Sequence, residues 1–209
     1  MNAFATPVSL SGQHVHLVPL AHQHHDDLVE AVRDGELWNH WYTAIPRPEG
    51  MAAEISRRLD LQAKGSMCPF AVMSPDSGKA VGMTTYMNID AANRRIEIGS
   101  TWYRQSVQRT PLNTEAKRLL MGHAFEQLHC IAVEFRTHFF NHQSRRGIER
   151  LGRTVEAAVE VAMDVAVALD RGDGVDVSLG RIDPQLVEPA DRRAGLPFEE
   201  GMHHRPGVG

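Results

Sequence analysis

The stretch "RRIEIGSTWYRQSVQRTPLNTEAKRLLMGHAFEQL" (residues 94–128) decides the fold of this chain. Residues 94–103 read as a strand, and a polar loop leads from them into a helix at roughly 113–128. The helix carries an apolar ridge with i, i+4 spacing, which predicts that it is buried on most sides. The ridge consists of Leu112, Ala116, Leu120, Ala124 and Leu128.

The start of this helix has the features of an anion site. The first turn of a helix has unpaired N–H groups and a partial positive charge, so it can seat an anion. Arg109 adds a full positive charge, and Thr110, Asn113 and Thr114 can cap the helix or donate hydrogen bonds. The alternative is a well-capped helix without a ligand, and the segment taken alone favours that alternative.

The other segments extend this unit into a mixed α/β pattern. Period-two alternation marks strands, and 3.6-residue periodicity marks helices. The resulting order, β-α-α-β-β-β-α-β-α-β-β, predicts an α+β fold with a mixed, mostly antiparallel central sheet and helices on both faces. The expected strands are 14–20, 69–74, 80–90, 94–103, 131–139, 159–169 and 175–179, and the expected helices are 25–35, 48–65, 113–128 and 141–152.

The last third of the chain differs in composition. From residue 155 onward there is no Trp or Tyr, and strict alternation on both sides of "RGDG" (171–174) predicts a hairpin rather than a helix. Residues 184–209 are rich in Pro, Gly and charge, and we expect them to be disordered. We therefore expect a single domain over 1–183, with a divergent hairpin at 155–183, followed by a tail.

Composition excludes several classes of function. The chain has 209 residues, of which 42% are hydrophobic, enough for one sizeable core. The net charge of −4 gives no long-range attraction for nucleic acid. No apolar run approaches the roughly 20 residues of a membrane span, and the N-terminus has no signal-peptide pattern. Because the chain has only two cysteines, far apart in sequence, we expect no disulfide framework and a cytoplasmic location. The histidine clusters lack the spacing of a metal site, so we expect no metal.

Four segments together resemble the GNAT superfamily of acyl-CoA-dependent N-acyltransferases, in the branch of the RimJ/RimL-like ribosomal-protein alanine N-acetyltransferases. They are "ELWNHWYTAIPRPEGM" (36–51), "NIDAANRRIEIGSTW" (88–102), the opening stretch, and "VEFRTHFFNHQSRRGIERLG" (133–152). The resemblance covers roughly residues 14–157. It implies an enzyme that transfers the acetyl group of acetyl-CoA to a primary amine, either a protein N-terminus or a small molecule, and acts as a monomer or homodimer.

The resemblance also implies where CoA binds. The family's pyrophosphate segment, Q/R-x-x-G-x-G/A, falls on residues 108–113, and Thr114 follows it. Gln108 matches the pattern, whereas Pro111 and Asn113 replace its two glycines. Because proline lacks a backbone donor, we expect Arg109 to compensate with a charge-assisted contact. The residues implied in CoA binding are Ser100, Thr101, Trp102 and Tyr103 along the pantetheine arm, Gln108, Arg109, Thr110, Pro111, Leu112, Asn113 and Thr114 at the pyrophosphate, and Asn141 and Ser144 near the thioester.

Direct attack of an amine on a thioester needs a base and a proton donor for the departing sulfur, but no enzyme nucleophile. By resemblance, Ser144 is the expected proton donor. Glu97 is the expected base, with His138 a weaker candidate, but Glu97 can equally form an ion pair with Arg95 or Arg136. The aromatic residues Trp38, Trp41 and Tyr42 are expected to contact the acceptor, or else to belong to the core. An alternative function is a GNAT scaffold that binds acyl-CoA or a partner without efficient transfer.

Overall fold

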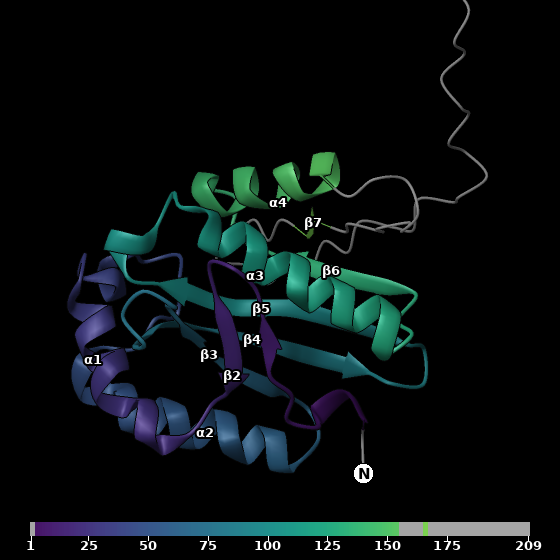
Figure 1. The fold of residues 1–209 in the computed structure, drawn as a ribbon, viewed down its shortest axis with the longest axis horizontal. Helices are drawn as coiled ribbons and strands as arrows, with labels where there is room; N and C mark the ends of the chain where they lie inside the picture. The colour runs from purple at the N-terminus through teal and green to yellow at the C-terminus, as the bar shows by residue number, and fades with distance from the viewer. Residues whose placement is uncertain (1–2, 155–164, 167–209) are drawn as a thin grey trace, which may run out of the picture. The chain divides into compact units, whose positions relative to one another are not determined.

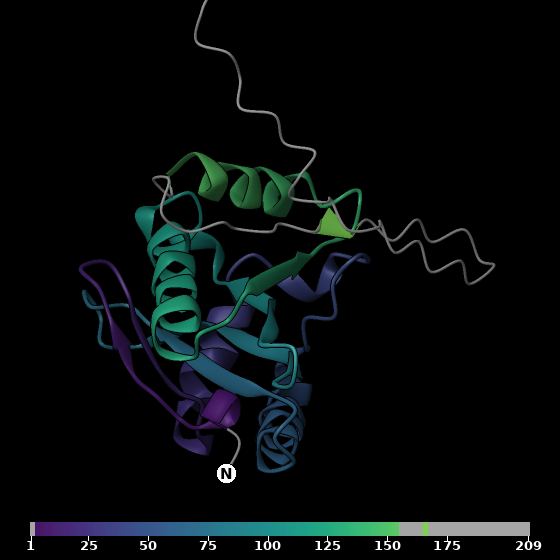
Figure 2. The same cartoon turned by 90° about the vertical axis from the view of Figure 1, so that its right-hand side faces the viewer.

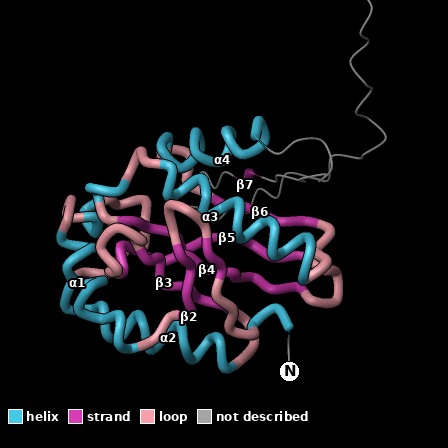
Figure 3. The backbone as a smooth tube through the Cα atoms, in the orientation of Figure 1, coloured by secondary structure: helices cyan, strands magenta, loops and turns pink. Residues whose placement is uncertain are grey.

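The computed structural model describes residues 3–154 and 165–166 (Figure 1). Figure 3 shows how helices and strands alternate along the described chain. The strands are β1 (Leu10–Ser11), β2 (His16–Pro19), β3 (Cys68–Met73), β4 (Ala80–Asp90), β5 (Arg95–Tyr103), β6 (Ala132–Arg136) and β7 (Val165–Ala166). The helices are α1 (His25–Arg33), α2 (Met51–Ala63), α3 (Pro111–Gly122), the π-helical turn η6 (His123–Gln127) and α4 (His142–Thr154).

The strands form one sheet in the order β1-β2-β3-β4-β5-β6-β7. Neighbours from β1 to β5 are antiparallel. Short turns join β3 to β4 and β4 to β5, whereas α1 and α2 lie between β2 and β3. The β5–β6 pair is parallel because α3 carries the chain back across the sheet, and β7 also runs parallel to β6. The expected α+β fold with a mixed, mostly antiparallel sheet is confirmed.

Helices cover both faces of the sheet, as the sequence predicts (Figure 2). Strand β3 shows why, since its alternating side chains enter two separate apolar clusters. Phe70 and Val72 pack with the buried face of α3 and with Ile148 of α4. Between them, Ala71 points to the opposite face and packs with residues of α1 and α2. The sheet is therefore the middle layer of the described part of the chain.

The prediction for the end of the long helix was wrong in one respect. The α-helix ends at Gly122, and residues 123–127 continue as the π-helical turn η6, in which the N–H of Leu128 donates to the carbonyl of His123. The hydroxyl of Tyr86, on β4, donates to the carbonyl of Leu120 over 2.6 Å. A side chain that donates to a helix carbonyl competes with the main-chain hydrogen bonds of the helix and favours a local π-turn. Because this side chain comes from a distant part of the sequence, helical periodicity does not reveal it.

Some predictions fall outside the described residues. Of the hairpin expected over 155–183, only the two residues of β7 are described, and the expected tail at 184–209 lies wholly outside. Strand β1 was not predicted, because a two-residue strand is too short to show alternation.

Two irregularities of β5 create the site. Met83 pairs with Trp102 while Thr85 pairs with Gly99, so β5 carries one extra residue between these pairs. This bulge contains Ser100, whose φ of 48° lies in the left-handed region. The second irregularity is that β5 pairs with β6 only from Arg95 to Glu97. Beyond Glu97, the edge of β5 that faces β6 is left without a partner strand in the described structure.

Candidate active site

A cavity of about 250 Å³ lies where the pairing of β5 and β6 ends. Its lining comes from five parts of the chain: the loop Tyr42–Ile45, Arg58 of α2, Ile98–Trp102 of β5, Lys117 of α3, and a last group of Phe135–His138, Asn141, Ser144 and Ile148 from β6 and α4. A larger open groove, of about 770 Å³, lies between residues 10–14 and α3. We assign the site to the smaller cavity because only there do the bulge and the free edge of β5 meet polar side chains.

The cavity brings together many of the residues predicted for CoA and the acceptor. Ser100, Thr101, Trp102, Asn141, Ser144 and Tyr42 all line it. Tyr103 is buried at the end of β5 but is not part of the lining. Glu97, Trp38, Trp41 and the whole segment 108–114 also lie outside the lining. The cavity thus gathers the residues predicted near the thioester, while the segment predicted for the pyrophosphate lies outside its lining.

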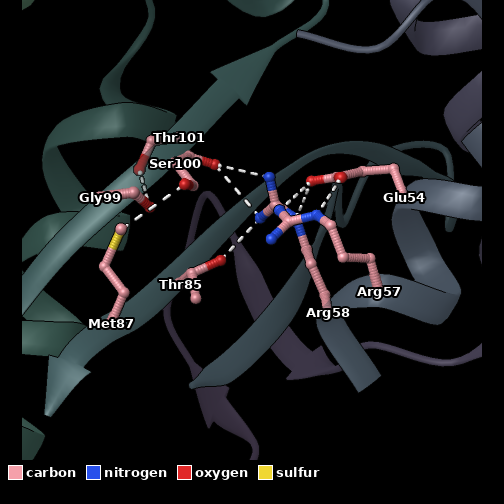
Figure 4. Close-up of polar contacts among 8 residues, drawn as sticks. All are labelled: Glu54, Arg57, Arg58, Thr85, Met87, Gly99, Ser100 and Thr101. Atoms are coloured by element: carbon pink, nitrogen blue, oxygen red, sulfur yellow. Dashed lines mark hydrogen bonds and ion pairs between the residues drawn. The ribbon is translucent and has the colours of Figure 1, made fainter. Parts of the chain in front are cut away.

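Arg58 reaches from α2 to the β5 bulge, where its guanidinium bonds Thr85 and Ser100 (Figure 4). Its side chain is 2% exposed, and its guanidinium donates to the Thr85 hydroxyl over 2.6 Å and to the Ser100 carbonyl over 3.2 and 3.3 Å. A residue in a bulge is unpaired within the ladder, so its carbonyl needs another donor. Arg58 supplies that donor and fixes the direction of the peptide group between Ser100 and Thr101.

Glu54 balances the charge of Arg58. Its Oε1 lies 2.7 Å from Nε of Arg58, and the half-exposed Arg57 contacts the other oxygen at 2.7 Å. Burial alone would raise the pKa of Glu54, but the hydrogen bond from Arg57 and the charge of Arg58 outweigh it and bring the pKa below its ordinary value. The buried cation under the bulge is therefore a paired one.

Glu97, the predicted base, is buried beside the cavity. Its Oε2 accepts from Nδ2 of Asn88 over 2.6 Å and lies 3.4 Å from Nε of Arg136. Burial raises the pKa of Glu97, while the Asn88 hydrogen bond and the charge of Arg136 oppose the rise. A Cβ on Gly99 would lie only 2.9 Å from Oε1 of Glu97, so this oxygen reaches the backbone of a cavity-lining residue.

The loop before α3 is held by its own side chains. Nε2 of Gln108 donates to the carbonyl of Tyr103 over 2.9 Å, and its Oε1 accepts from Gln143 of α4 over 3.0 Å. The Thr110 hydroxyl accepts from the N–H of Leu112, which makes Thr110 the N-cap of α3. Arg109, at a φ of 63°, is exposed and free to turn toward a ligand. Gln108, one of the predicted pyrophosphate residues, therefore uses both ends of its side-chain amide for hydrogen bonds within the protein.

The start of α4 has a similar cap. The backbone N–H of Ser144 donates to Oδ1 of Asn141 over 3.0 Å. This bond occupies the amide oxygen of Asn141 and leaves its NH₂ group to donate toward the cavity. Both side chains are partly exposed in the lining, so the expected roles of Asn141 and Ser144 near a thioester remain compatible with the geometry.

An aromatic wall stands at the mouth of the cavity. The ring of His138 lies 5.0 Å from that of Trp41, 6.2 Å from Tyr42 and 5.6 Å from Phe140. Trp41 is 70% exposed, so it is not a core residue. Nδ1 of His138 accepts from the N–H of Phe140 over 3.2 Å, which in the neutral ring places the proton on Nε2. Trp38 instead packs against the α1 and α2 cluster, under Arg47.

Sequence reasoning missed Arg58 and Lys117. Both are charged residues on the apolar stripe of a helix, and both are buried in the structure. Arg58 follows Met51 and Ile55 on the inner face of α2, and Lys117 stands next to Ala116 and one turn before Met121 on α3. A charge inside an apolar stripe is the signal that could have found them, since charged residues are almost never fully buried without a reason.

The residues described here form no group of three His, Cys, Asp or Glu side chains that could hold a metal ion. None of the helices in the described ranges combines the length and the hydropathy of a membrane span. The free edge of β5 and the polar side chains around it fit an extended organic ligand that carries amide groups, such as the pantetheine arm expected from the sequence.

Comparison with known proteins agrees with this geometry. No curated protein matches the chain. The crystal structure of a GCN5-related N-acetyltransferase from Brucella melitensis is 33% identical, with a TM-score of 0.58, over 69% of this chain and 66% of that one. RimL, a ribosomal L7/L12 alpha-N-protein acetyltransferase, is 16% identical with a TM-score of 0.61, over 69% and 80% of the two chains.

A Salmonella typhimurium acetyltransferase that modifies the N-terminal serine of ribosomal protein L7/L12 is 15% identical with a TM-score of 0.60, over 69% and 83%. At such low identity, the likeness to these two ribosomal-protein enzymes concerns the fold alone. The family itself is shown by sequence, because the model of the Acetyltransferase (GNAT) domain matches residues 14–154, which is more than half of the chain. The protein therefore belongs to the GNAT family of acetyltransferases.

Proposed function

We propose that the cavity between β5 and β6 is the active site of an N-acetyltransferase that moves the acetyl group of acetyl-CoA to a primary amine. The observation that carries this proposal is the free edge of β5, where Ile98–Trp102 line the cavity beyond the last β5–β6 pair. An extended chain with amide groups can pair with such an edge as an added strand does. Family membership supports acetyl-CoA as the donor.

The donor's binding is assigned to two surfaces. Ser100, Thr101 and the NH₂ group of Asn141 face the pantetheine arm. The first turn of α3 and the side chain of Arg109 hold the pyrophosphate, where Arg109 offsets the donor that Pro111 lacks. Gln108 contributes indirectly. It donates to the Tyr103 carbonyl of β5 and accepts from Gln143 of α4, and these two hydrogen bonds hold the loop before α3 in place.

The chemistry is assigned to Glu97 and Ser144. Acetyl-CoA supplies an activated acetyl thioester. The amine attacks it directly, so the C–N bond forms first, through a tetrahedral intermediate, and the C–S bond then breaks. Glu97 accepts the proton that the amine loses, by way of a water beside Gly99, since Oε1 of Glu97 reaches that backbone. Its raised pKa brings Glu97 closer to the range in which a general base works best. The Ser144 hydroxyl, on the lining, returns a proton to the departing sulfur.

The acceptor is assigned to the aromatic wall at the mouth of the cavity. Tyr42 lines the cavity, and Trp41 exposes most of its side chain beside it. Exposed aromatic residues of this kind supply contact area to a bound chain at a low cost in conformational entropy. A protein N-terminus is the favoured acceptor class, and a small amine is the other one. Trp38 has no place in this proposal because it packs under Arg47, away from the lining.

Two measurements test this function. Acetyl-CoA at millimolar concentration should raise the melting temperature of the protein, and release of free thiol should appear with some members of a panel of peptides and small amines. Ser144→Ala and Glu97→Gln should slow thiol release while acetyl-CoA still raises the melting temperature. Absence of any thermal shift would reject a CoA site of any kind.

A second candidate is a scaffold that binds acyl-CoA without efficient transfer. It is favoured by the pyrophosphate loop, where Pro111 lacks an N–H and both ends of the Gln108 amide are already bonded. The same two measurements separate the candidates: a thermal shift with acetyl-CoA but no thiol release with any amine would select the scaffold.

A further inference from the structure

Lys117 places a positive charge at the end of the cavity that lies against α3. Lys117 is only 6% exposed, and it lines the cavity together with Gly99, Ser100 and Ser144. The ammonium lies 5.8 Å from the centre of the Phe135 ring, on β6. On the α4 side it lies 3.6 Å from the position of a Cβ on Gly147, so the absence of a side chain there gives it room.

The charge of Lys117 is not balanced by any side chain that the structure describes. Among residues 3–151, no carboxylate forms an ion pair with its ammonium and no acceptor forms a hydrogen bond with it. Burial, together with the smaller effect of the positive charge of Arg150 on α4, lowers the pKa of Lys117 to about 8. On the β6 side, the ammonium faces the ring of Phe135, which carries no negative charge. Lys117 differs in this from Arg58, which lines the same cavity but is paired with Glu54.

A neighbouring polar group is also unsatisfied. Oδ1 of Asn113, one turn before Lys117 on the same face of α3, is buried and has no hydrogen-bond partner in the described structure. Its Nδ2 lies 3.6 Å from the same Gly147 position that Lys117 approaches. A buried cation and a buried amide oxygen without partners are both costly, and a ligand that brings negative charge and donors would relieve them.

The reaction proposed for this site creates one such negative charge. When the C–S bond breaks, its electron pair stays on the sulfur, while the proton of the amine passes to the base. We propose that Lys117 is a catalytic residue whose ammonium stabilises the CoA thiolate as it leaves. Lys117 keeps its own proton in this step, and the Ser144 hydroxyl then relays a proton to the sulfur, taking one from solvent as it gives its own. The inference rests on the proposed function, since it requires CoA in this cavity.

The state of the bound thiol tests the role of Lys117 without turnover. CoA is bound to the full-length protein, and the ultraviolet absorbance of the thiolate is followed as the pH is raised. In the wild-type protein, the pKa of the bound thiol should lie below that of free CoA. In Lys117→Met, which keeps the length of the side chain, it should rise by about one unit or more, because a nearby cation is lost. Arg118→Met is the matched control, since it removes an exposed cation from the next position of α3.

The affinities for CoA and for desulfo-CoA show whether a negative result concerns Lys117 alone or the proposed function as a whole. Desulfo-CoA, which has no thiol, should bind equally to wild-type protein and Lys117→Met, whereas CoA above the thiol pKa should bind the variant about tenfold more weakly. If wild-type protein binds CoA but its thiol pKa equals that of free CoA, the role of Lys117 is overturned while the function stands. Equal thiol pKa values in wild-type protein and Lys117→Met overturn it as well. If wild-type protein binds neither compound, the proposed function fails and the inference falls with it.

Discussion

The guanidinium of Arg58 donates two hydrogen bonds to the main-chain carbonyl of Ser100, over 3.3 Å from Nη1 and 3.2 Å from Nη2. Arg58→Met should destabilise the protein by about 3–5 kcal/mol, because it removes a buried, paired cation together with its hydrogen bonds to the Thr85 hydroxyl and the Ser100 carbonyl, and leaves Glu54 with Arg57 alone. Urea unfolding measures this loss. Arg57→Met is the control: Arg57 bonds the same carboxylate from a side chain that is 51% exposed, so its removal should cost about 1 kcal/mol or less.

A double variant separates stability from positioning. Glu54→Met with Arg58→Met removes both charges, so it should recover much of the stability that Arg58→Met loses. The Ser100 carbonyl still lacks its donor there, so kcat should stay low even though the fold is restored. Full recovery of kcat in the double variant would show that Arg58 serves only the fold.

Most of the fold could be predicted because its signals are local. The ridge from Leu112 to Ala124 predicted the buried helix, and alternation from Val81 to Met87 predicted a strand of the hairpin, since periodicity depends only on near neighbours in sequence. The turn η6 could not be predicted in this way. At the end of α3 the Leu120 carbonyl accepts a hydrogen bond from the hydroxyl of Tyr86 on β4, a contact that helical periodicity does not record.

The candidate site was predicted less completely, for the same reason. Ser100, Asn141 and Ser144 were found through a family pattern, and the structure gathers them around one cavity. Its place on the apolar stripe of α2 could have marked Arg58 as buried, but its partners Thr85 and Ser100 lie 27 and 42 residues away, so the sequence does not show what it bonds. Burial and charge compensation are properties of the folded chain, and the choice between a base and an ion pair for Glu97 depends on both.

Replacement of Lys117 should change how stability depends on pH. The pKa of Lys117 is lowered from 10.5 to about 8 in the folded protein, so the unfolded chain binds more protons between these values. The folded state therefore carries a penalty of about 3 kcal/mol below pH 8, which disappears as the pH rises toward 10.5. Lys117→Met lacks this penalty and should be more stable at neutral pH.

The difference in stability between Lys117→Met and the wild-type protein is the quantity to measure, by urea unfolding at a series of pH values. It should be constant below pH 8 and should shrink between pH 8 and 10.5. Arg118→Met should show no such change over that range, because its side chain is exposed. A variant less stable than wild-type protein at neutral pH would mean that Lys117 supports the fold rather than a ligand.

Trp41→Ala should affect the acceptor and little else. Trp41 is 70% exposed, so its loss should change stability by no more than about 0.5 kcal/mol. If the aromatic wall binds the acceptor, KM for the amine should rise several-fold while KM for acetyl-CoA stays the same. Ile131→Ala is the control, since Ile131 is also exposed, at 56%, but precedes β6 at the end away from the cavity. Equal KM values for the amine in both variants would exclude Trp41 from the acceptor site.

Arg109→Ala tests the pyrophosphate seat. A charge-assisted contact from an exposed side chain is worth about 1–2 kcal/mol, so the Kd for acetyl-CoA should rise about five- to thirtyfold. Dephospho-CoA keeps the pyrophosphate and should lose the same factor, whereas pantetheine lacks it and should bind both proteins alike. An unchanged Kd for acetyl-CoA would remove Arg109 from the site, and a loss absent with dephospho-CoA would place Arg109 at the 3′-phosphate instead.

The pH profile of turnover tests Glu97. Because burial raises the pKa of Glu97 from 4.5, a base at this position predicts that kcat/KM falls on the acidic side at a pH above 4.5. Asn88→Gly removes the hydrogen bond that lowers this pKa, and glycine accepts the φ of 47° found at residue 88. The acidic limb should therefore move to higher pH in Asn88→Gly.

Asn93→Gly is the control for that shift. Asn93 lies in the same hairpin connection, but its amide and backbone N–H bond Asp90 rather than Glu97. The acidic limb of Asn93→Gly should coincide with that of the wild-type protein. Glu97→Gln should slow turnover while it still binds acetyl-CoA. If Asn88→Gly and Asn93→Gly share one profile with the wild-type protein, the limb belongs to another group, and Glu97 is then a partner of Asn88 and Arg136 rather than the base.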